Sequence, residues 1–487
     1  MNRDRTTVIV AGMGPVGALL ASLLGSRGVP TVVIEPQHGP YPKPRAAVLD
    51  AEAIRALTLV PGLPPFETWA TAVDRNGVMD ARHRPLFMVE QTARVFGHPQ
   101  VARLDQPALE AGLRAAATGT GHVRILAGRS VTGVEQDDDE VTVVLDDGSR
   151  VTGQWLAGCD GLGSAVRTAA GIGFPGDTYP QPWLVVDARN RETGETPSSV
   201  AFVLDPDRPC VAMSQRDRRR WEWMLLPGED PDRMTAEETV RSLVGAWVEP
   251  GGLDIERTAV FTFHARTADR WRAGRVLLAG DAAHVMPPFA GAGLGMGIRD
   301  AAALAWRLAD VAGGADPELL DGYEQERRPD VERMTAMASR MGRIVQSRSR
   351  TTVRLVRLVL RLLAPLAGAG ARPLPARRLS RSVAGPLPGA GRALPNPRVS
   401  VGGGPPQRLD EVIGYRWAYI GHGCDPRSVT TGIPAGVALV ALDHPDPAPG
   451  CLAMTDLDGL LTARAGTVTV ARPDRFLKGR LTGAGHS

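Results

Sequence analysis

The chain of 487 residues is 43% hydrophobic and 22% charged, which is the composition of a folded globular protein of about three domains and excludes a disordered chain. Its 56 basic and 53 acidic residues leave a net charge of +3, which does not indicate a nucleic-acid-binding protein.

The cysteines are far apart and include no CxxC pair; they are Cys159, Cys210, Cys424 and Cys451. This spacing argues against a disulfide framework and against a zinc site, and we expect no bound metal. No apolar run reaches the roughly 18 residues that a transmembrane helix needs, so we expect no membrane span.

The first segment has the pattern of a dinucleotide-binding unit. Residues 7–11 (TVIVA) are typical of a buried parallel strand, and a glycine-rich loop, a predicted helix (ALLASLLGSR) and a second strand (TVVIE) follow. In such a loop the first glycine permits a sharp turn, the second lets the backbone approach a pyrophosphate, and the third lets helix and strand pack closely. The helix N-terminus then favours the phosphate charge. The loop residues are Gly12, Gly14, Pro15, Val16 and Gly17.

Glu35 ends the second strand, where a carboxylate accepts hydrogen bonds from an adenosine ribose and repels a 2′-phosphate. The unit therefore predicts FAD or NAD rather than NADP, without choosing between the two. Arg3 and Arg5 before an apolar stretch also resemble a secretory signal. Because glycines interrupt that stretch at motif spacing, we expect a cytoplasmic protein instead.

Two later segments combine a strand, an acidic residue and glycines. Residues 155–167 (WLAGCDGLGSAVR) lead a strand into Asp160 and Gly161, which alone would be an ordinary turn. Residues 275–299 (RVLLAGDAAHVMPPFAGAGLGMGIR) lead a strand into Asp281, then into a glycine-rich loop and a helix beginning DAAALAWRLA. Asp281 can bind a polyol, while the loop amides and the helix N-terminus can approach a flat ring and stabilise negative charge on it.

These three motifs resemble, in order and spacing, those of the class A flavoprotein aromatic hydroxylases, the para-hydroxybenzoate hydroxylase superfamily. Residues 218–231 (RRRWEWMLLPGEDP) and 280–301 (GDAAHVMPPFAGAGLGMGIRDA) are most similar to the 3-(3-hydroxyphenyl)propionate hydroxylase branch. That branch also resembles actinomycete polyketide-tailoring hydroxylases of secondary metabolism. The resemblance covers residues 6–345 well and the remainder more faintly, and it does not identify the substrate.

The resemblance implies FAD as cofactor and NADH or NADPH as co-substrate. It assigns the first motif and Glu35 to the ADP half of FAD, Asp160 and Gly161 to FAD and the passing nicotinamide, and Asp281 to the ribityl chain. It also implies that the carbonyl of Pro288 faces the substrate. The other implied cofactor-binding positions are Arg45, Arg103, Gln106, Gly293, Leu294 and Gly295, the last two through their backbone amides.

Three positions depart from the family pattern. Pro36 stands where arginine is frequent, Ala292 where glutamine is common, and Gly295 where asparagine is common. The changes remove side-chain contacts beside the cofactor. Because the backbone contacts need no side chain, we expect flavin binding to survive.

The implied fold combines α/β and α+β parts. A Rossmann-like FAD-binding domain (1–72, 100–178 and 265–345) is interleaved with a β-sheet substrate domain (73–99 and 179–264), where stretches such as WLVVDA and AFVLD alternate. Candidate pocket-lining residues of that sheet, each of which could equally be a core residue, are Trp183, Phe202, Met213, Trp221, Trp223 and Met224.

The C-terminal third is less regular. Residues 346–406 are predicted as a helical and linker segment, in which the basic amphipathic stretch 345–363 forms a helix packed on the FAD domain; a membrane-surface helix is the alternative. Residues 407–487 resemble a shortened thioredoxin-like domain, and without a CxxC pair we expect it to have no redox role. Monomer and homodimer both stay open.

The implied reaction is the oxygenation of a phenolic or polycyclic aromatic substrate by O2. NADH or NADPH reduces FAD, and a C4a-hydroperoxyflavin transfers oxygen to the ring while the protein excludes water and deprotonates the phenol. Baeyer–Villiger oxidation, dechlorination and antibiotic inactivation share every motif above, and a non-oxygenating flavoprotein oxidase is a further alternative. The sequence does not identify the base: His284 is better explained by a structural hydrogen bond, and the weaker candidates are His83, His98, Tyr179 and His264.

Overall fold

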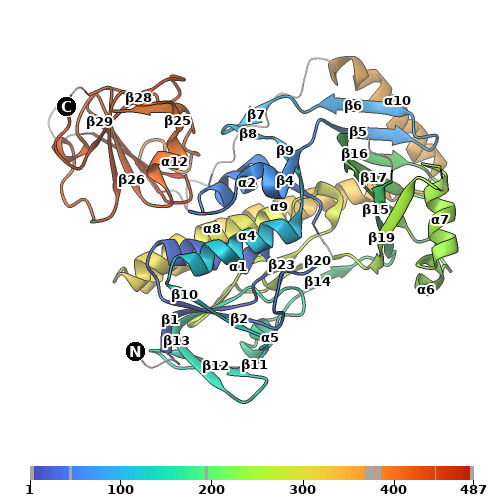
Figure 1. Ribbon diagram of the computed structural model, residues 1–487, viewed down its shortest axis with the longest axis horizontal. Coiled ribbons are helices and arrows are strands. Elements are labelled where there is room, and N and C mark those ends of the chain that lie inside the picture. The colour runs from blue at the N-terminus through green and yellow to red at the C-terminus, as the bar shows by residue number, and fades with distance from the viewer. Residues whose placement is uncertain are drawn as a thin grey trace.

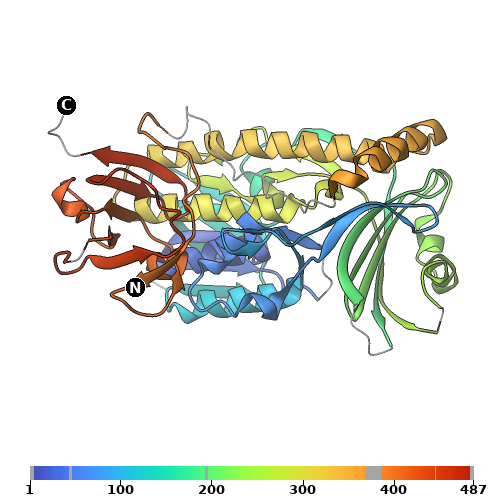
Figure 2. The same ribbon diagram turned by 90° about the horizontal axis from the view of Figure 1, so that it is seen from above.

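The computed structural model describes residues 5–42, 46–191, 196–249, 251–367, 379, 385–444 and 446–482. Three large sheets lie in a row along the molecule (Figure 2): a C-terminal sheet at one end, a nucleotide-binding sheet in the middle and a mainly antiparallel sheet at the other end. The prediction of mixed helix and sheet content is confirmed, because helices separate these sheets and cover them (Figure 1).

The nucleotide-binding sheet has the strand order β10-β2-β1-β13-β12-β11, with β22 and β21 continuing beside β13. The strands β10, β2, β1, β13 and β22 run parallel, and their β-branched runs are buried as expected for a sheet covered on both faces. The bounds are β1 (Arg5–Ala11), β2 (Thr31–Glu35), β10 (Val123–Ala127), β11 (Val131–Gln136), β12 (Val141–Leu145), β13 (Arg150–Gly158), β21 (Arg272–Ala273) and β22 (Val276–Leu278).

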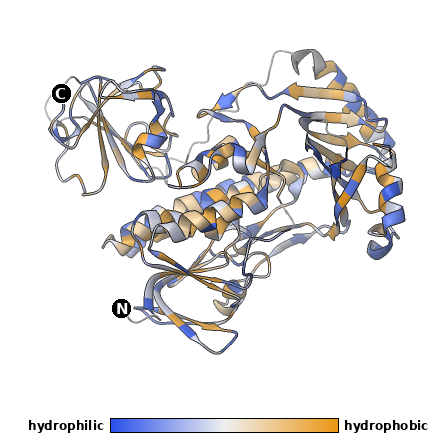
Figure 3. Ribbon diagram, viewed as in Figure 1, coloured by the Kyte–Doolittle hydropathy of each residue, from blue (hydrophilic) through white to orange (hydrophobic). Residues whose placement is uncertain are grey.

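Three helices cover this sheet on the side of the other domains: α1 (Pro15–Ser26), α4 (Gln106–Gly119) and α8 (Gly293–Ala312). Apolar residues predominate on them (Figure 3). Helix α8 begins at Gly293, seven residues before the start that the sequence suggested. The first turns contain several glycines, whose low helix propensity made the sequence there resemble a loop. A Cβ at Gly297 would lie 2.6 Å from Cγ2 of Val16, so glycine permits the close packing of α8 on α1.

The antiparallel sheet is assembled from two separate stretches of chain. Its order is β19-β15-β18-β17-β16-β5-β6, in which β5 pairs in parallel with β16. The short helices α6 (Pro231–Met234) and α7 (Glu237–Gly245) pack on its outer face. The bounds are β5 (Arg75–Asp80), β6 (Pro85–Glu90), β15 (Trp183–Asn190), β16 (Thr196–Leu204), β17 (Cys210–Arg216), β18 (Arg218–Met224) and β19 (Leu253–Phe261).

Small elements connect these two sheets. One three-stranded sheet contains β3 (Val48–Asp50), β9 (Val101–Leu104) and β4 (Ala70–Ala72); another contains β14 (Gly176–Thr178), β20 (His264–Thr267) and β23 (His284–Val285). The remaining elements there are α2 (Ala51–Thr58), α3 (Phe66–Trp69), α5 (Ala165–Ala169), β7 (Arg94–Val95), β8 (His98–Pro99) and the 3₁₀ turns η1 (Gly280–Ala282), η2 (Pro288–Ala290) and η3 (Pro317–Leu320).

The long helix α9 (Asp321–Val345) is followed by α10 (Arg350–Ala367), the basic amphipathic stretch. The expectation that this helix packs on the FAD domain is wrong: Val353 packs against Leu86 and Leu204 of the antiparallel sheet. The reason is that α9 has already carried the chain past the nucleotide-binding sheet (Figure 2). Within the described part of the chain, no helix is long and apolar enough to span a membrane.

The C-terminal sheet has the order β25-β24-β28-β27-β26-β29-β30. Because β24 pairs with β28, this sheet starts at residue 398 and not after 406, where the proline- and glycine-rich sequence suggested a linker. The bounds are β24 (Arg398–Val401), β25 (Gln407–Arg408), α12 (Leu409–Ile413), β26 (Ala418–His422), η4 (Pro426–Ser428), β27 (Ala438–Leu442), β28 (Leu452–Asp456), β29 (Thr467–Ala471) and β30 (Leu477–Thr482).

Buried ion pairs attach the C-terminal sheet to the rest of the molecule. Asp410 on α12 accepts hydrogen bonds from Nε and Nη2 of Arg55 on α2, at 2.6 and 2.9 Å, and from Nε of Arg475 at 2.7 Å. Burial alone would raise the pKa of Asp410, but the two guanidinium groups lower it to about 2. Glu326 of α9 likewise accepts hydrogen bonds from Arg472, at 2.8 and 2.9 Å.

The substitution Asp410→Ala leaves two buried guanidinium groups without their counter-ion. We expect the free energy of unfolding to fall by about 3–5 kcal/mol, because removing one partner of a buried ion pair leaves an uncompensated charge. Urea denaturation followed by tryptophan fluorescence measures the loss. In the matched control Asp458→Ala the partner Arg398 is solvent-exposed, and a loss as large as that of Asp410→Ala would contradict the prediction.

Candidate functional site

A cavity of about 980 Å³ extends from the carboxyl ends of the parallel strands to the inner face of the antiparallel sheet. Its volume is at the upper end of the range of about 300–1,000 Å³ that is usual for ligand pockets. Residues of β1, β2, the loop after β13, α4 and the start of α8 line one end, which we call the outer end. Residues of β5, β16, β17 and β18 line the other, which we call the inner end.

The three glycines of the first motif have three different structural requirements. Gly12 has a φ of +92°, and a Cβ there would lie 2.5 Å from the carbonyl oxygen of Cys159. A Cβ at Gly17 would lie 2.0 Å from the carbonyl oxygen of Gly12. Gly14 lines the cavity, and a Cβ there would meet no protein atom within 4 Å. Gly12 and Gly17 therefore serve the close packing of the loop, whereas Gly14 leaves space open on the cavity side.

Glu35 lies at the carboxyl end of β2 and lines the cavity. Its Oε2 accepts a hydrogen bond from the backbone amide of Met13 at 2.6 Å, and its Oε1 accepts one from the amide of Gln37 at 2.9 Å. These bonds join the glycine loop to the end of β2 and fix the position of the carboxylate. Each oxygen keeps further acceptor capacity for a ligand hydroxyl.

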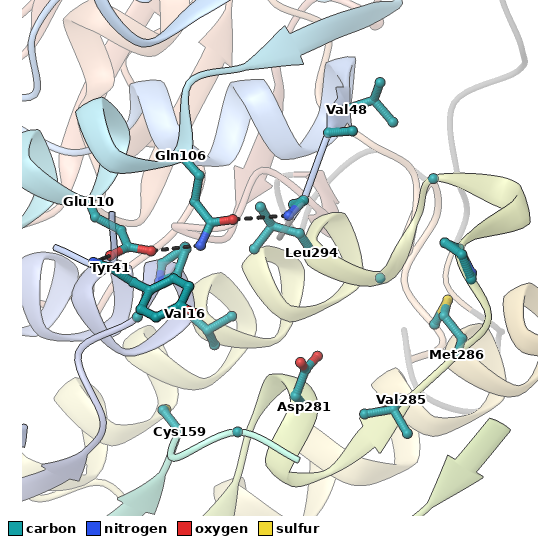
Figure 4. A pocket seen from close by; sticks show the side chains of 18 of the residues that line it. Val16, Tyr41, Val48, Gln106, Glu110, Cys159, Asp281, Val285, Met286 and Leu294 are labelled. Atoms are coloured by element: carbon teal, nitrogen blue, oxygen red, sulfur yellow. Dashed lines mark hydrogen bonds between the residues drawn. The ribbon is translucent and has the colours of Figure 1, made fainter. Parts of the chain in front are cut away.

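Gln106 and Glu110 on α4 bind backbone amides of the cavity wall and each other (Figure 4). The Gln106 side chain accepts a hydrogen bond from the amide of Ala46 at 3.0 Å and donates one to Glu110 at 2.7 Å. Glu110 also accepts a hydrogen bond from the amide of Tyr41 at 3.1 Å, and burial raises its pKa. The sequence analysis did not select Glu110, although its i+4 spacing from Gln106 places both residues on one helix face.

Asp160 and Gly161 follow β13 and line the cavity beside the first glycine loop. Asp160 accepts hydrogen bonds from Oγ of Ser164 at 2.5 Å and from the amide of Val166 at 3.0 Å. Burial raises the pKa of Asp160. This residue therefore orders the turn that leads into α5 as well as facing the cavity.

Asp281 follows β22, in the 3₁₀ turn η1, and its side chain is exposed to the cavity. Figure 4 shows its carboxylate pointing into the cavity, below the start of α8 at Leu294. Parallel strands place their carboxyl ends at one edge of a sheet, which is why the residues that follow β1, β13 and β22 meet there.

The N-terminus of α8 faces the same space. The intrahelical hydrogen bonds begin with Met296 N to Ala292 O at 2.9 Å, so the amides of Gly293, Leu294 and Gly295 precede the helical ladder. Gly293 and Leu294 line the cavity. Unpaired amides at the positive end of a 20-residue helix favour negative charge on a ligand.

Pro288 and His284 lie between Asp281 and α8. The Pro288 carbonyl accepts a hydrogen bond from the amide of Gly291 at 2.8 Å, and Pro288 lines the cavity. His284 is buried and its Nε2 lies 2.6 Å from Oδ2 of Asp300, which also pairs with Arg327 at 2.8 Å. These contacts are structural, and the described lining of the cavity contains no histidine.

The cavity therefore gathers most of the residues that the sequence singled out for the cofactor. The members that line it are Gly12, Gly14, Pro15, Val16, Glu35, Gln106, Asp160, Gly161, Asp281, Pro288, Gly293 and Leu294. Gly17, Arg103 and Gly295 are not part of the lining, and Arg45 lies outside the described residues. Arg103 is buried behind the wall and its Nε donates to Oε1 of Gln215 at 3.3 Å. The contact of these residues with FAD stays a prediction.

The candidate pocket residues of the antiparallel sheet divide into three groups. Phe202 and Met213 line the inner end of the cavity. Trp221 and Trp223 point to the outer face, where they pack toward α7. Trp183 and Met224 are buried in a cluster with Phe289 and do not line the cavity. Alternation along each strand separates Trp221 and Trp223 from the other four residues, since successive side chains point to opposite faces.

Alternation also brings Glu222, between Trp221 and Trp223, to the cavity wall. The sequence analysis did not select this residue. The signal was present in the pattern RRRWEWM, in which two tryptophans of one face flank an acidic residue of the other face.

Comparisons with known proteins agree with this geometry. The family described as FAD binding domain matches residues 5–338, and the family described as HcaD C-terminal domain matches residues 391–485. The chain is 32% identical over 533 residues to a 3-(3-hydroxy-phenyl)propionate/3-hydroxycinnamic acid hydroxylase 2 of Burkholderia vietnamiensis (strain G4 / LMG 22486), covering 99% of this chain and 95% of that protein.

Two solved structures have a similar fold. The flavin-dependent monooxygenase PieE in complex with FAD and substrate has a TM-score of 0.80 and 22% identity, covering 100% of this chain and 97% of the other. The OxyS anhydrotetracycline hydroxylase of Streptomyces rimosus has a TM-score of 0.72 and 28% identity, covering 98% and 96%.

Alanine at Gly14 and alanine at Gly17 test the two kinds of glycine. In Gly14→Ala the added methyl group meets no protein atom, so we expect a folded protein that has lost much of its bound FAD. In Gly17→Ala the methyl group collides with backbone, which costs stability by about 1–3 kcal/mol or more. Melting temperature and flavin absorbance per protein separate the two effects. A Gly14→Ala protein with full FAD content would contradict the assigned role of Gly14.

Asp281→Ala tests the assignment of the η1 turn. We expect loss of most of the bound FAD, because a carboxylate at this strand end supplies the acceptors for a polyol chain. Flavin absorbance after gel filtration measures the occupancy. The control is Asp177→Ala in β14, at an exposed position outside the cavity lining. Unchanged flavin content in Asp281→Ala would show that the loop has another role.

Proposed function

This chain belongs to the FAD-binding family of flavoprotein aromatic hydroxylases, and from that premise we propose how its cavity is divided between cofactor and substrate. The protein is an FAD-dependent aromatic monooxygenase with NAD(P)H and O2 as co-substrates. In the proposed division FAD occupies the outer end, along β1, β2 and β13, and reaches the start of α8. The aromatic substrate occupies the inner end, against the antiparallel sheet.

The observation that carries this proposal is the convergence of three segments on one cavity. Gly14 leaves room beside the N-terminus of α1 for a pyrophosphate, and Glu35 offers carboxylate oxygens to a ribose. Asp281 faces the space that a ribityl chain would cross, and the amides of Leu294 and Gly295 precede the helical ladder of α8. When bound, FAD supplies the transfer of reducing equivalents and the activation of O2.

The residues of the inner end bind the substrate and exclude water. Phe202 and Met213 come from the sheet, while Phe289 and Met341 come from the η2 turn and from α9. Leu360 of α10 closes the same end. Apolar walls favour a flat aromatic ring through the area they bury, and they protect a reactive oxygen species from water.

The relatives and structural neighbours support a phenolic or polycyclic aromatic substrate for this cavity. The named relative acts on hydroxyphenylpropionate and hydroxycinnamic acid, and a neighbour acts on anhydrotetracycline. Hydroxylation is the reaction that we propose here. Baeyer–Villiger oxidation, dechlorination and antibiotic inactivation would use the same cavity and would give different products.

For the C-terminal sheet we propose a thioredoxin-like fold with a structural role. The parallel strands β28, β27 and β26, followed by the antiparallel strands β29 and β30, agree with that fold. Burial raises the pKa values of Cys424 and Cys451 above that of an ordinary thiol. Thiols that resist ionisation are poor nucleophiles, which supports the expectation that this sheet has no redox role.

A cytoplasmic location and a monomer or homodimer complete the proposal. The reaction consumes NADH or NADPH, which the cytoplasm supplies. The four cysteines are all free, as is usual in a reducing compartment.

Turnover with phenolic substrates tests the function directly. We expect the purified protein to carry FAD and to oxidise NAD(P)H faster in the presence of a phenol that it accepts. Mass spectrometry with isotopically labelled O2 should then find one labelled oxygen atom on the ring of the product. NAD(P)H oxidation that yields only hydrogen peroxide, across phenolic acids and polycyclic phenols alike, would instead support a non-oxygenating oxidase.

A further inference from the structure

One acidic side chain lies in the wall of the inner end. Glu222 belongs to β18, in register with Val185 of β15 on one side and Val211 of β17 on the other. It is only partly buried, and it lines the cavity together with Val211 and Met213.

The carboxylate of Glu222 makes no hydrogen bond and no ion pair with any residue that the structure describes. Two arginines whose charges act on Glu222 are paired with another carboxylate, that of Asp187. Arg220 donates hydrogen bonds to Asp187 at 2.6 and 3.0 Å, and Arg257 lies 3.7 Å from Asp187. Arg103 donates from Nε to Gln215 at 3.3 Å; its Nη1 has no hydrogen-bond partner among the described residues, and the residue is not part of the cavity lining. A partly buried carboxylate that lacks a protein partner is costly unless a ligand satisfies it.

The surroundings of Glu222 raise its pKa above that of an ordinary glutamate. Burial raises its pKa, Asp187 of β15 raises it further, and Arg220 on the same strand, Arg103 of β9 and Arg257 of β19 lower it; the net shift is upward. A raised carboxylate pKa brings the group closer to neutral pH, where proton transfer to and from it is most effective.

Apart from Glu222, the described residues that line the inner end are uncharged. Its apolar lining includes Val200, Phe202, Val211, Met213, Met341 and Leu360, and Asn76 is a neutral polar member. Among the described residues that line this end, Glu222 is the one charged group. A substrate carboxylate held there would face a like charge and find no cation in the described wall, which is a strong penalty in a water-poor cavity.

We propose that Glu222 accepts the proton of the substrate's ring hydroxyl, and that this chain therefore selects uncharged phenols over phenolic carboxylic acids. The inference rests on the proposed function, because it assigns the inner end to the aromatic substrate. The O–H bond of the phenol breaks, the proton forms a bond to a carboxylate oxygen of Glu222, and the electron pair stays on the phenolate oxygen. The phenolate activates the ring for oxygenation, and the proton returns to the hydroxyl of the product.

The first experiment is Glu222→Gln in the holoenzyme, with a neutral phenol as substrate. We expect kcat to fall by about 100-fold or more, as for loss of a general base, while KM changes little. The rise of wild-type kcat with pH that follows the ionisation of Glu222 should be absent from the variant below about pH 9, because Gln has no proton to lose. Activity of the variant should recover above about pH 9–10, where a phenol ionises without help. Glu222→Asp should restore part of kcat.

The matched control is Glu256→Gln on β19, whose carboxylate pairs with Arg189 at 2.9 Å away from the cavity. It should leave kcat and the pH profile unchanged. If Glu222→Gln also leaves them unchanged, the proposal is overturned. It is equally overturned if the variant loses melting temperature and FAD, since Glu222 would then be a structural counter-ion of the arginines.

The second experiment compares 3-(3-hydroxyphenyl)propionate with its methyl ester at a pH where the acid is ionised. Binding to the oxidised holoenzyme is read from the change in flavin absorbance, so no turnover is needed. We expect the ester to bind at least about tenfold more tightly, with a smaller difference in Glu222→Gln. Tighter binding of the acid by the wild type would overturn the selectivity. The proposed function itself fails only if no phenol, neutral or acidic, is oxygenated.

Discussion

The close approach of backbone to backbone at the carboxyl edge of the nucleotide-binding sheet is the constraint on which the rest of the site depends. The loop after β1 packs directly on the end of β13, since a Cβ at Gly12 would lie 2.5 Å from the carbonyl oxygen of Cys159. Helix α8 packs on α1 in the same way through Gly297. Two helix N-termini and the ends of three strands therefore share one cavity, and no side chain fills the space between them.

This constraint explains how much of the cofactor end could be predicted from sequence. At Gly17 a Cβ would lie 2.0 Å from a backbone oxygen, so no other residue fits there. The spacing of such glycines can therefore be recognised directly in the sequence. The acidic residues Glu35, Asp160 and Asp281 lie at or just after the ends of apolar strands that the sequence shows clearly. The engagement of Gln106 with Glu110 and Ala46 could not be predicted, because it depends on how a helix faces a loop distant in sequence.

The substrate end was predictable only in outline. Side chains along its strands point alternately to the two faces of the sheet, but this alternation alone does not predict which face lines the cavity. The tryptophans of β18 were attractive candidates for an aromatic pocket, yet α7 covers the face to which Trp221 and Trp223 belong. The position of α10 over the antiparallel sheet depends on the length of α9, and the start of the C-terminal sheet depends on a strand hidden among prolines and glycines.

The two ends of the cavity therefore use different chemistry, and this difference has a consequence for specificity. At the cofactor end, backbone amides and carboxylates fixed by hydrogen bonds line the cavity. At the substrate end, side chains form the wall. The arginines Arg220 and Arg103, which act on Glu222 through their charge, are not part of that lining, and Arg220 is paired with Asp187. Family membership therefore identifies the cofactor, whereas we expect the residues that face the ring to determine the substrate.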